Sequence, residues 1–130
     1  MQSNYTVIIE DFAIGHFIKK FSKKYNNHWD TTLIAIRGQL ERIDTLLNTE
    51  KAETIIDAGD IKIIKTQFRV DRTKESAKAS GNRTIVAWKV KEKSVHILLV
   101  YSKTDLSGHN ETVEWQRLIK DNYPQYNDII

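Results

Sequence analysis

Three consecutive strand-like segments in the second half of the chain constrain the fold more than any other feature. Residues 61–70 and 83–91 alternate apolar and polar side chains, and residues 95–101 are almost continuously apolar. Alternation is typical of a half-buried strand, whereas a short continuous apolar run indicates a strand covered on both faces. Consecutive strands tend to pair with their sequence neighbours, so we expect an antiparallel meander with residues 95–101 as a central strand.

Two amphipathic helices precede this run of strands. Apolar residues recur at helical spacing in residues 12–25 and again in residues 31–47, and Asp11 and Asp30 are placed to cap the two helices. A strand at residues 5–10 comes first, residues 48–60 are polar and irregular, and a last helix is expected at about residues 110–122. The expected apolar face of this last helix consists of Val113, Leu118 and Ile119, and little in the tail after it is expected to hold it in place.

The resulting element order, β-α-α-β-β-β-α, predicts an α+β fold. Its mainly antiparallel four-stranded sheet would carry the two N-terminal helices on one face. The chain length of 130 residues fits a single domain over residues 1–130. Because the chain has no cysteine, a disulfide scaffold, a thiolate zinc site and a cysteine nucleophile are excluded. The N-terminal residues lack a signal-peptide pattern, and no apolar stretch approaches the roughly 18 residues of a membrane span, so we expect a cytoplasmic protein without a membrane partner.

Positive charge is concentrated between Lys62 and Lys103. This segment holds eleven Lys or Arg residues and three Asp or Glu residues, a net charge of +8, although the net charge of the whole chain is only +3. A basic half of this kind indicates a polyanionic partner such as nucleic acid. The alternative is a solvated sheet face that carries lysines for solubility.

Antiparallel topology brings basic and aromatic residues of three strands to one end of the sheet. The end of one strand lies beside the start of the next, so Arg69 comes near Arg83, and Tyr101 and Lys103 return to the same end. The basic loop at residues 71–82 contains no large apolar residue, so we expect it to be mobile and to lie over this end, with His109 close behind.

Strand register decides which of these side chains share a face. A two-residue turn at Glu92–Lys93 would set Arg83 opposite Ser102, and one further residue in the turn would set it opposite Lys103. The pattern of side chains leaves both registers open.

If the polyanionic partner is RNA, its cleavage through the 2′-hydroxyl would require a base, an acid and cations that stabilise charge on the phosphate. The planar guanidinium of Arg83 can donate hydrogen bonds to two phosphate oxygens at once. His109 is suited to acid or base chemistry. Tyr101 can stack on a base or donate a proton, and Lys103 could accept a proton only if neighbouring cations favour its neutral form. The same condition applies to Lys74 and Lys78.

Further residues are candidates for binding the RNA backbone. No carboxylate pair stands out and the histidines lack metal-ligand spacing, so we expect no metal and no cofactor. The candidates are Lys65, Arg72, Lys74, Lys78 and Lys89. For Lys65, Arg72 and Lys89, a solvated surface face fits the sequence equally well.

Two short motifs and the element order resemble a known family. The sequence GNR opens the strand at Arg83, and ILLVYSK, residues 97–103, closes the next strand. These features resemble the RelE/ParE superfamily of bacterial toxins, in particular its HigB-like members, mainly over residues 61–120. The chain differs from the family pattern at Asn82, where an aromatic residue is common, and in its long 71–82 loop and long second helix.

This resemblance implies the toxin of a type II toxin–antitoxin system. Such a toxin is a ribosome-dependent, metal-independent mRNA endonuclease that inhibits translation, and its antitoxin is an acidic or helix-turn-helix protein. The resemblance makes Arg83 the phosphate and transition-state contact, places Lys103 and Arg69 at basic site positions, and gives His109 an acid–base role. Two alternatives stay open: a ParE-like toxin that inhibits DNA gyrase without nuclease activity, and an inactive relative that only binds RNA or protein.

Overall fold

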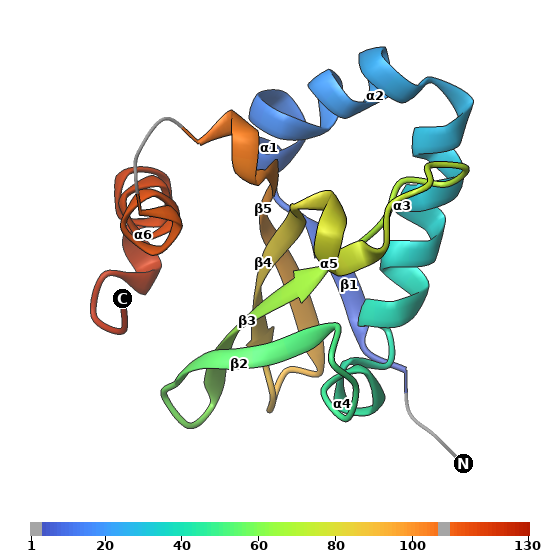
Figure 1. Cartoon of the computed structure of the whole chain (residues 1–130). Helices are drawn as coiled ribbons and strands as arrows, with labels where there is room; N and C mark the ends of the chain where they lie inside the picture. The colour runs from blue at the N-terminus through green and yellow to red at the C-terminus, as the bar shows by residue number, and fades with distance from the viewer. Residues whose placement is uncertain (1–3, 107–109) are drawn as a thin grey trace.

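A five-stranded mixed sheet forms the centre of the computed structural model, which describes residues 4–106 and 110–130 (Figure 1). Its strand order is β1-β5-β4-β3-β2, with β1 parallel to β5 and all other pairs antiparallel. The expected α+β class is therefore confirmed, and β5 is a central strand as its apolar sequence predicts. The strands are β1 (Thr6–Ile9), β2 (Ala52–Asp57), β3 (Ile61–Gln67), β4 (Asn82–Lys89) and β5 (Ser94–Ser102).

The expected count of four strands is wrong, because β2 lies in the segment expected to be irregular. This strand pairs only with β3 and forms the edge of the sheet, so most of its side chains are at least partly exposed. An edge strand carries polar residues on a solvated side and loses the alternation that marks a half-buried strand. Gly59, with φ of 86°, lies in the turn that joins β2 to β3.

The N-terminal helices cover one face of the sheet. A continuous helical segment consists of α1 (Asp11–Ala13), a π-helical turn (η1, Ile14–Ile18) and α2 (Lys19–Tyr25). It is followed by α3 (Asn27–Leu40) and α4 (Ile43–Leu46), so the second helix begins before the expected cap at Asp30. Phe21 of α2 and Trp29 of α3 stack with ring centroids 4.7 Å apart, and both contact Phe68 beyond the end of β3.

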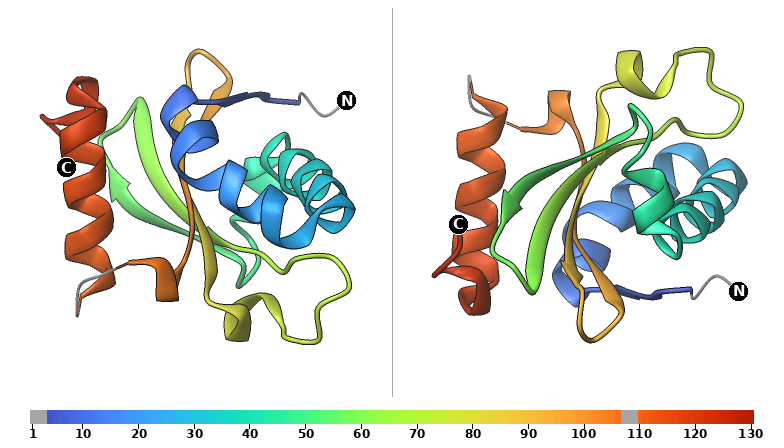
Figure 2. Two further views of the ribbon diagram at one scale, coloured as in Figure 1. Left: turned by 90° about the horizontal axis from the view of Figure 1, so that it is seen from above. Right: turned by 90° about the horizontal axis from the view of Figure 1, so that it is seen from below.

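The last helix, α6 (Glu111–Asn122), covers the opposite face (Figure 2). Asn110 caps it by accepting a hydrogen bond from the N–H of Val113. Trp115 and Ile119 are buried, whereas the side chain of Val113 is 56% exposed, so its predicted place on the apolar face is wrong. The sheet is thus covered by helices on both faces, and in the first turn of α6 Thr112 and Val113 are exposed.

The pairing of β4 with β5 differs from both registers considered from the sequence. Arg83 lies opposite Tyr101, because the connection spans residues 90–93 and a bulge shifts the register between Ile85 and Val86. On the other side of β4, Arg83 lies opposite Gln67 of β3. Arg83, Gln67 and Tyr101 therefore form one row on the face that α6 covers.

The 71–82 loop is anchored at both ends and contains a helical turn, α5 (Ala77–Ser80), that the sequence did not predict. Thr32 of α3 accepts a hydrogen bond from the N–H of Asp71 at 2.7 Å, and Ser76 caps α5. Gly81, with φ of 74°, then turns the chain into β4. Two further short helical turns are η2 (Lys103–Asp105) and η3 (Pro124–Tyr126), and no helix among the described residues is long and apolar enough to cross a membrane.

The C-terminal tail packs against the sheet, contrary to the expectation that little holds it. Tyr123 is buried, and its hydroxyl donates a hydrogen bond to the backbone carbonyl of Leu98 at 2.7 Å. Tyr126 is buried as well. Burial raises the pKa of both phenols, that of Tyr126 to about 12, so both remain hydrogen-bond donors at neutral pH.

We predict that Tyr123→Phe lowers the free energy of unfolding by about 1 kcal/mol, because the carbonyl of Leu98 loses its tyrosine donor in a buried environment. Urea denaturation of the two proteins measures the difference. Tyr25→Phe is the matched control, since its hydroxyl makes no hydrogen bond among the described residues. Equal losses in both variants would show that the tail contact contributes nothing specific.

Candidate functional site

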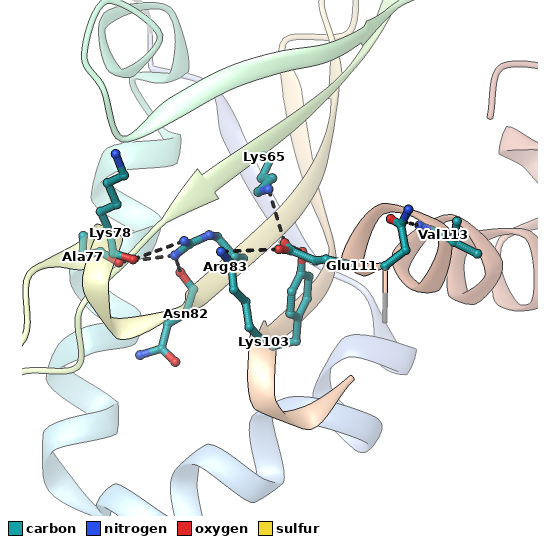
Figure 3. Close-up of polar contacts among 10 residues, drawn as sticks. Lys65, Ala77, Lys78, Asn82, Arg83, Lys103, Glu111 and Val113 are labelled. Carbon is teal, nitrogen blue, oxygen red and sulfur yellow. Dashed lines mark hydrogen bonds and ion pairs between the residues drawn. The ribbon is translucent and has the colours of Figure 1, made fainter. Parts of the chain in front are cut away.

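A carboxylate surrounded by three donors lies at the end of the sheet where β3, β4 and β5 meet (Figure 3). Glu111, in the first turn of α6, accepts a hydrogen bond from the hydroxyl of Tyr101 at 2.5 Å through Oε2. The same oxygen lies 3.3 Å from Nζ of Lys65, and Oε1 lies 3.7 Å from Nζ of Lys103. We call these four residues, Lys65, Tyr101, Lys103 and Glu111, the Glu111 cluster.

The members of the Glu111 cluster come from four different elements. Lys65 projects from β3, Tyr101 from β5, Lys103 from η2 and Glu111 from α6. The backbone N–H of Lys103 donates to the carbonyl of Gly81 at 2.9 Å, which extends the pairing of β4 with β5 beyond the strand end. The cluster therefore depends on the strand register and on the docking of α6.

Tyr101 is held as a hydrogen-bond donor. Its side chain is fully buried. Burial raises the pKa of the phenol far above its ordinary value, and the hydrogen bond to Glu111 and the charge of Glu111 raise it further; the charge of Arg83 acts weakly in the other direction. The phenol is consequently protonated throughout the physiological pH range.

Glu111 is held as a carboxylate. Partial burial disfavours its charged form, but the hydrogen bond from Tyr101 and the charges of Lys65 and Lys103 outweigh this effect. The pKa of Glu111 therefore lies below its ordinary value of 4.5. Its position in the first turn of a helix also favours a negative charge.

Arg83, the predicted phosphate contact, is buried with an exposed fraction of 3%. Its guanidinium donates to the backbone carbonyls of Asn82 at 2.9 Å, Lys78 at 3.2 Å and Ala77 at 3.3 Å. Figure 3 shows it pointing toward the 71–82 loop, while the two lysines point toward Glu111. In this conformation Arg83 anchors the loop, and its Nε is buried without a hydrogen-bond partner among the described residues.

A groove of about 760 Å³ leads to the Glu111 cluster. It lies between the β2–β3 edge and the start of α5, and Lys65 belongs to both the groove and the cluster. Its volume falls within the range typical of ligand sites. The residues that line this main groove are Thr49, Glu50, Lys51, Ala52, Glu53, Lys65, Gln67, Ser76, Ala77 and Lys78.

The other predicted site residues take up different positions. Arg69 is exposed and lines a neighbouring pocket of about 320 Å³, which shares Lys51 and Gln67 with the main groove. Lys78 lines the main groove, and Arg72 and Lys74 are exposed on the 71–82 loop.

Lys89 and His109 lie outside this arrangement for different reasons. Lys89 ends β4, about 20 Å along the strand from Arg83, where its Nζ lies 6.0 Å from the ring centroid of Tyr126. It therefore does not join the cluster. His109 lies outside the described residues, and its acid–base role remains a prediction.

Two residues of the candidate site, Glu111 in the cluster and Lys51 in the main groove, were not predicted from the sequence. An acidic residue directly after a helix cap ordinarily complements the helix dipole, so Glu111 carried no distinguishing signal. Lys51 precedes the unpredicted strand β2, and its place in the groove could not be recognised without that strand. Among residues 4–106 and 110–130, no group of three His, Asp or Glu side chains is arranged to hold a metal ion.

Comparison with solved structures gives a match of the fold. The chain is similar to a chain in the crystal structure of the archaeal RelE–RelB complex from Pyrococcus horikoshii OT3, with a TM-score of 0.55 and 17% sequence identity. The similarity covers 77% of this chain and 96% of that chain. No family model matches the sequence, and no curated protein sequence does so.

This match defines the structural class. The chain has a RelE-like α+β fold, as the strand motifs and element order predicted. At this level of identity the similarity shows the fold alone, and assignment to the HigB-like branch remains a prediction.

We predict that Arg83→Ala lowers the free energy of unfolding by about 2 kcal/mol, because three backbone carbonyls lose a charged donor. It should also increase proteolytic cleavage within residues 71–82. Urea denaturation and limited proteolysis measure the two effects. Arg69→Ala, an exposed arginine at the same sheet end, should change stability by less than about 0.5 kcal/mol; an equally small effect of Arg83→Ala would contradict the anchoring role.

We also predict that the stabilisation provided by Glu111 depends on pH. Because its pKa is lowered in the folded state, the contribution is present above the ordinary value of 4.5 and is lost as the pH falls through the lower folded-state value. Wild type should therefore exceed Glu111→Gln in unfolding free energy at neutral pH, and the difference should shrink as the pH is lowered below 4.5. A pH series of urea denaturation curves measures it, and a difference independent of pH would contradict this role.

Proposed function

We propose that the chain is the toxin of a type II toxin–antitoxin system and cleaves mRNA on the ribosome without a metal ion. The observation that carries the proposal is the Glu111 cluster, in which two lysines and a tyrosine converge on one anion position, and one of these lysines, Lys65, also lines the main groove. A phosphodiester presents anionic oxygens that the same donors can bind.

The donors suit the charge requirements of RNA cleavage. When the 2′-hydroxyl attacks phosphorus, negative charge grows on the nonbridging oxygens and on the departing 5′-oxygen. In the proposed reaction Lys65 and Lys103 stabilise this charge, and Tyr101 donates a hydrogen bond without losing its proton. His109 is the proposed acid or base, and water exchanges the other proton, so that the 2′-hydroxyl proton is removed and the departing 5′-oxygen is protonated. Arg83 supports the site through the loop that it anchors.

The main groove is the proposed path of the RNA strand. Lys51, Lys65 and Lys78 line it, so a single strand in the groove would meet cations along its backbone. Arg69 borders the adjoining pocket and would extend this contact. Exposed Arg72 and Lys74 on the neighbouring loop are further proposed contacts to RNA.

A cognate antitoxin is the proposed protein partner. The structure similar to this chain comes from a complex of RelE with RelB. By analogy with that pairing, we propose an acidic or helix-turn-helix antitoxin that binds this chain and blocks its activity.

One observation favours a second candidate, an inactive relative that binds RNA without cutting it. The guanidinium of Arg83 is bonded to three backbone carbonyls and is directed away from the Glu111 cluster. A chain in which this arginine serves only to anchor a loop would retain an anion-binding site and lack a phosphate contact for catalysis.

We predict that induced expression of the wild-type chain halts growth and leaves cleaved transcripts. Purified protein should cleave mRNA on intact ribosomes and leave a 5′-hydroxyl on the downstream fragment, as attack by the 2′-hydroxyl requires. Lys65→Ala should reduce the cleavage rate about 100-fold, since it removes a donor from the charge developing on phosphate. Primer extension on cellular mRNA and a ribosome-based cleavage assay measure these effects.

Lys91→Ala is the matched control, because this exposed lysine pairs with Asp60 at the far end of the sheet. It should cleave as wild type does. Intact transcripts with retained RNA binding would favour the inactive relative, and a 5′-phosphate on the downstream fragment would contradict attack by the 2′-hydroxyl.

A further inference from the structure

The carboxylate of Glu111 occupies the position that an anionic ligand of this site would take. Both of its oxygens face cations, and one of them also accepts a hydrogen bond from the hydroxyl of Tyr101. The donors come from three elements, β3, β5 and η2, so the site does not belong to one local turn. Such convergence of donors on a single point is the geometry expected of an anion-binding site.

The positive charge around the carboxylate of Glu111 is greater than the single negative charge that this carboxylate supplies. Lys65 and Lys103 contribute two positive charges, and buried Arg83 lies close enough to influence the ionisation of Tyr101. Glu111 supplies one negative charge. A phosphodiester also carries one negative charge shared between two free oxygens, so it can replace the carboxylate with the same donors.

The carboxylate of Glu111 can withdraw without unfolding α6. Thr112 and Val113 are exposed, and the buried anchors Trp115 and Ile119 lie further along α6. Glu111 itself is 21% exposed and borders solvent. Withdrawal of its carboxylate would therefore break the contacts of the Glu111 cluster and leave the apolar anchors of the helix in place.

We propose that Glu111 is an intramolecular competitor of phosphate, which closes the site formed by Lys65, Tyr101 and Lys103 until an RNA phosphate displaces it. The positions of the three donors define the anion site, and its assignment to RNA rests on the proposed function. Glu111 thereby sets the affinity of the chain for its ligand, and a ligand must supply enough further contacts in the main groove to displace it.

A role for Glu111 as the general base fits these contacts less well. A base must direct an unengaged lone pair at the proton that it removes, and a base works best when its pKa is near the working pH. The carboxylate of Glu111 faces Tyr101, Lys65 and Lys103, and its pKa is lowered. Removal of Glu111 should therefore strengthen binding, whereas removal of a base would abolish cleavage.

The test compares the binding of a short 2′-O-methyl oligoribonucleotide, which cannot be cleaved, to wild type and to Glu111→Gln by fluorescence anisotropy. We expect Glu111→Gln to bind about tenfold more tightly at low salt. Because it makes two lysines available, the plot of log K against log salt should become steeper by about one unit. Adding Lys65→Ala to Glu111→Gln should remove most of this gain.

Asp121→Asn is the matched control, since it removes the same charge from an exposed position of α6. It should change affinity by less than about threefold, because an exposed charge is screened by salt. Thermal unfolding verifies that each variant is folded, and Glu111→Ala provides a second test of the same position. Equal affinities and salt slopes for wild type, Glu111→Gln and Asp121→Asn would overturn the proposal.

Cleavage assays on the same variants separate this proposal from the proposed function. Tighter binding by Glu111→Gln without cleavage by any variant would support the competitor and reject the nuclease. Loss of cleavage in Glu111→Gln with unchanged affinity would make Glu111 a base and overturn the competitor.

Discussion

The pairing of β4 with β5 is the constraint on which the site depends. It places Arg83 opposite Tyr101 and continues as the hydrogen bond from Lys103 to Gly81. A shift of one residue would turn Tyr101 to the other face of the sheet and remove the donor nearest to Glu111. The bulge between Ile85 and Val86 contributes to this register, so a local irregularity in the middle of the sheet affects which side chains meet at its end.

The cations at this end of the sheet serve different purposes according to their shape. The planar fork of Arg83 satisfies several carbonyls at once, so it can be buried against the 71–82 loop. Lys65 and Lys103 keep their ammonium groups near solvent, where they can exchange one anion for another. The buried arginine holds the 71–82 loop, and the lysines are the anion-binding groups of the proposed site.

Much of the fold could be predicted from the sequence because it depends on side-chain periodicity. The alternation in residues 61–70 and the apolar run in β5 identified the strands, and antiparallel connectivity placed Arg83 and Tyr101 at the same sheet end. The edge strand β2 was not predicted, because its exposed residues follow no burial pattern. The role of Glu111 in the site was not predicted for a different reason. Its contacts join α6 to three distant segments, and a local sequence pattern carries no information about such contacts.

The irregular pairing of β2 with β3 has a consequence for the behaviour of the chain in solution. The register shifts between Thr54 and Ile56, so the outer edge of the sheet is not a straight ladder of donors and acceptors. The charged ends of the strand, at Glu53 and Asp57, would also repel an identical strand laid against it. Edge-to-edge pairing of two copies through β2 is thereby disfavoured.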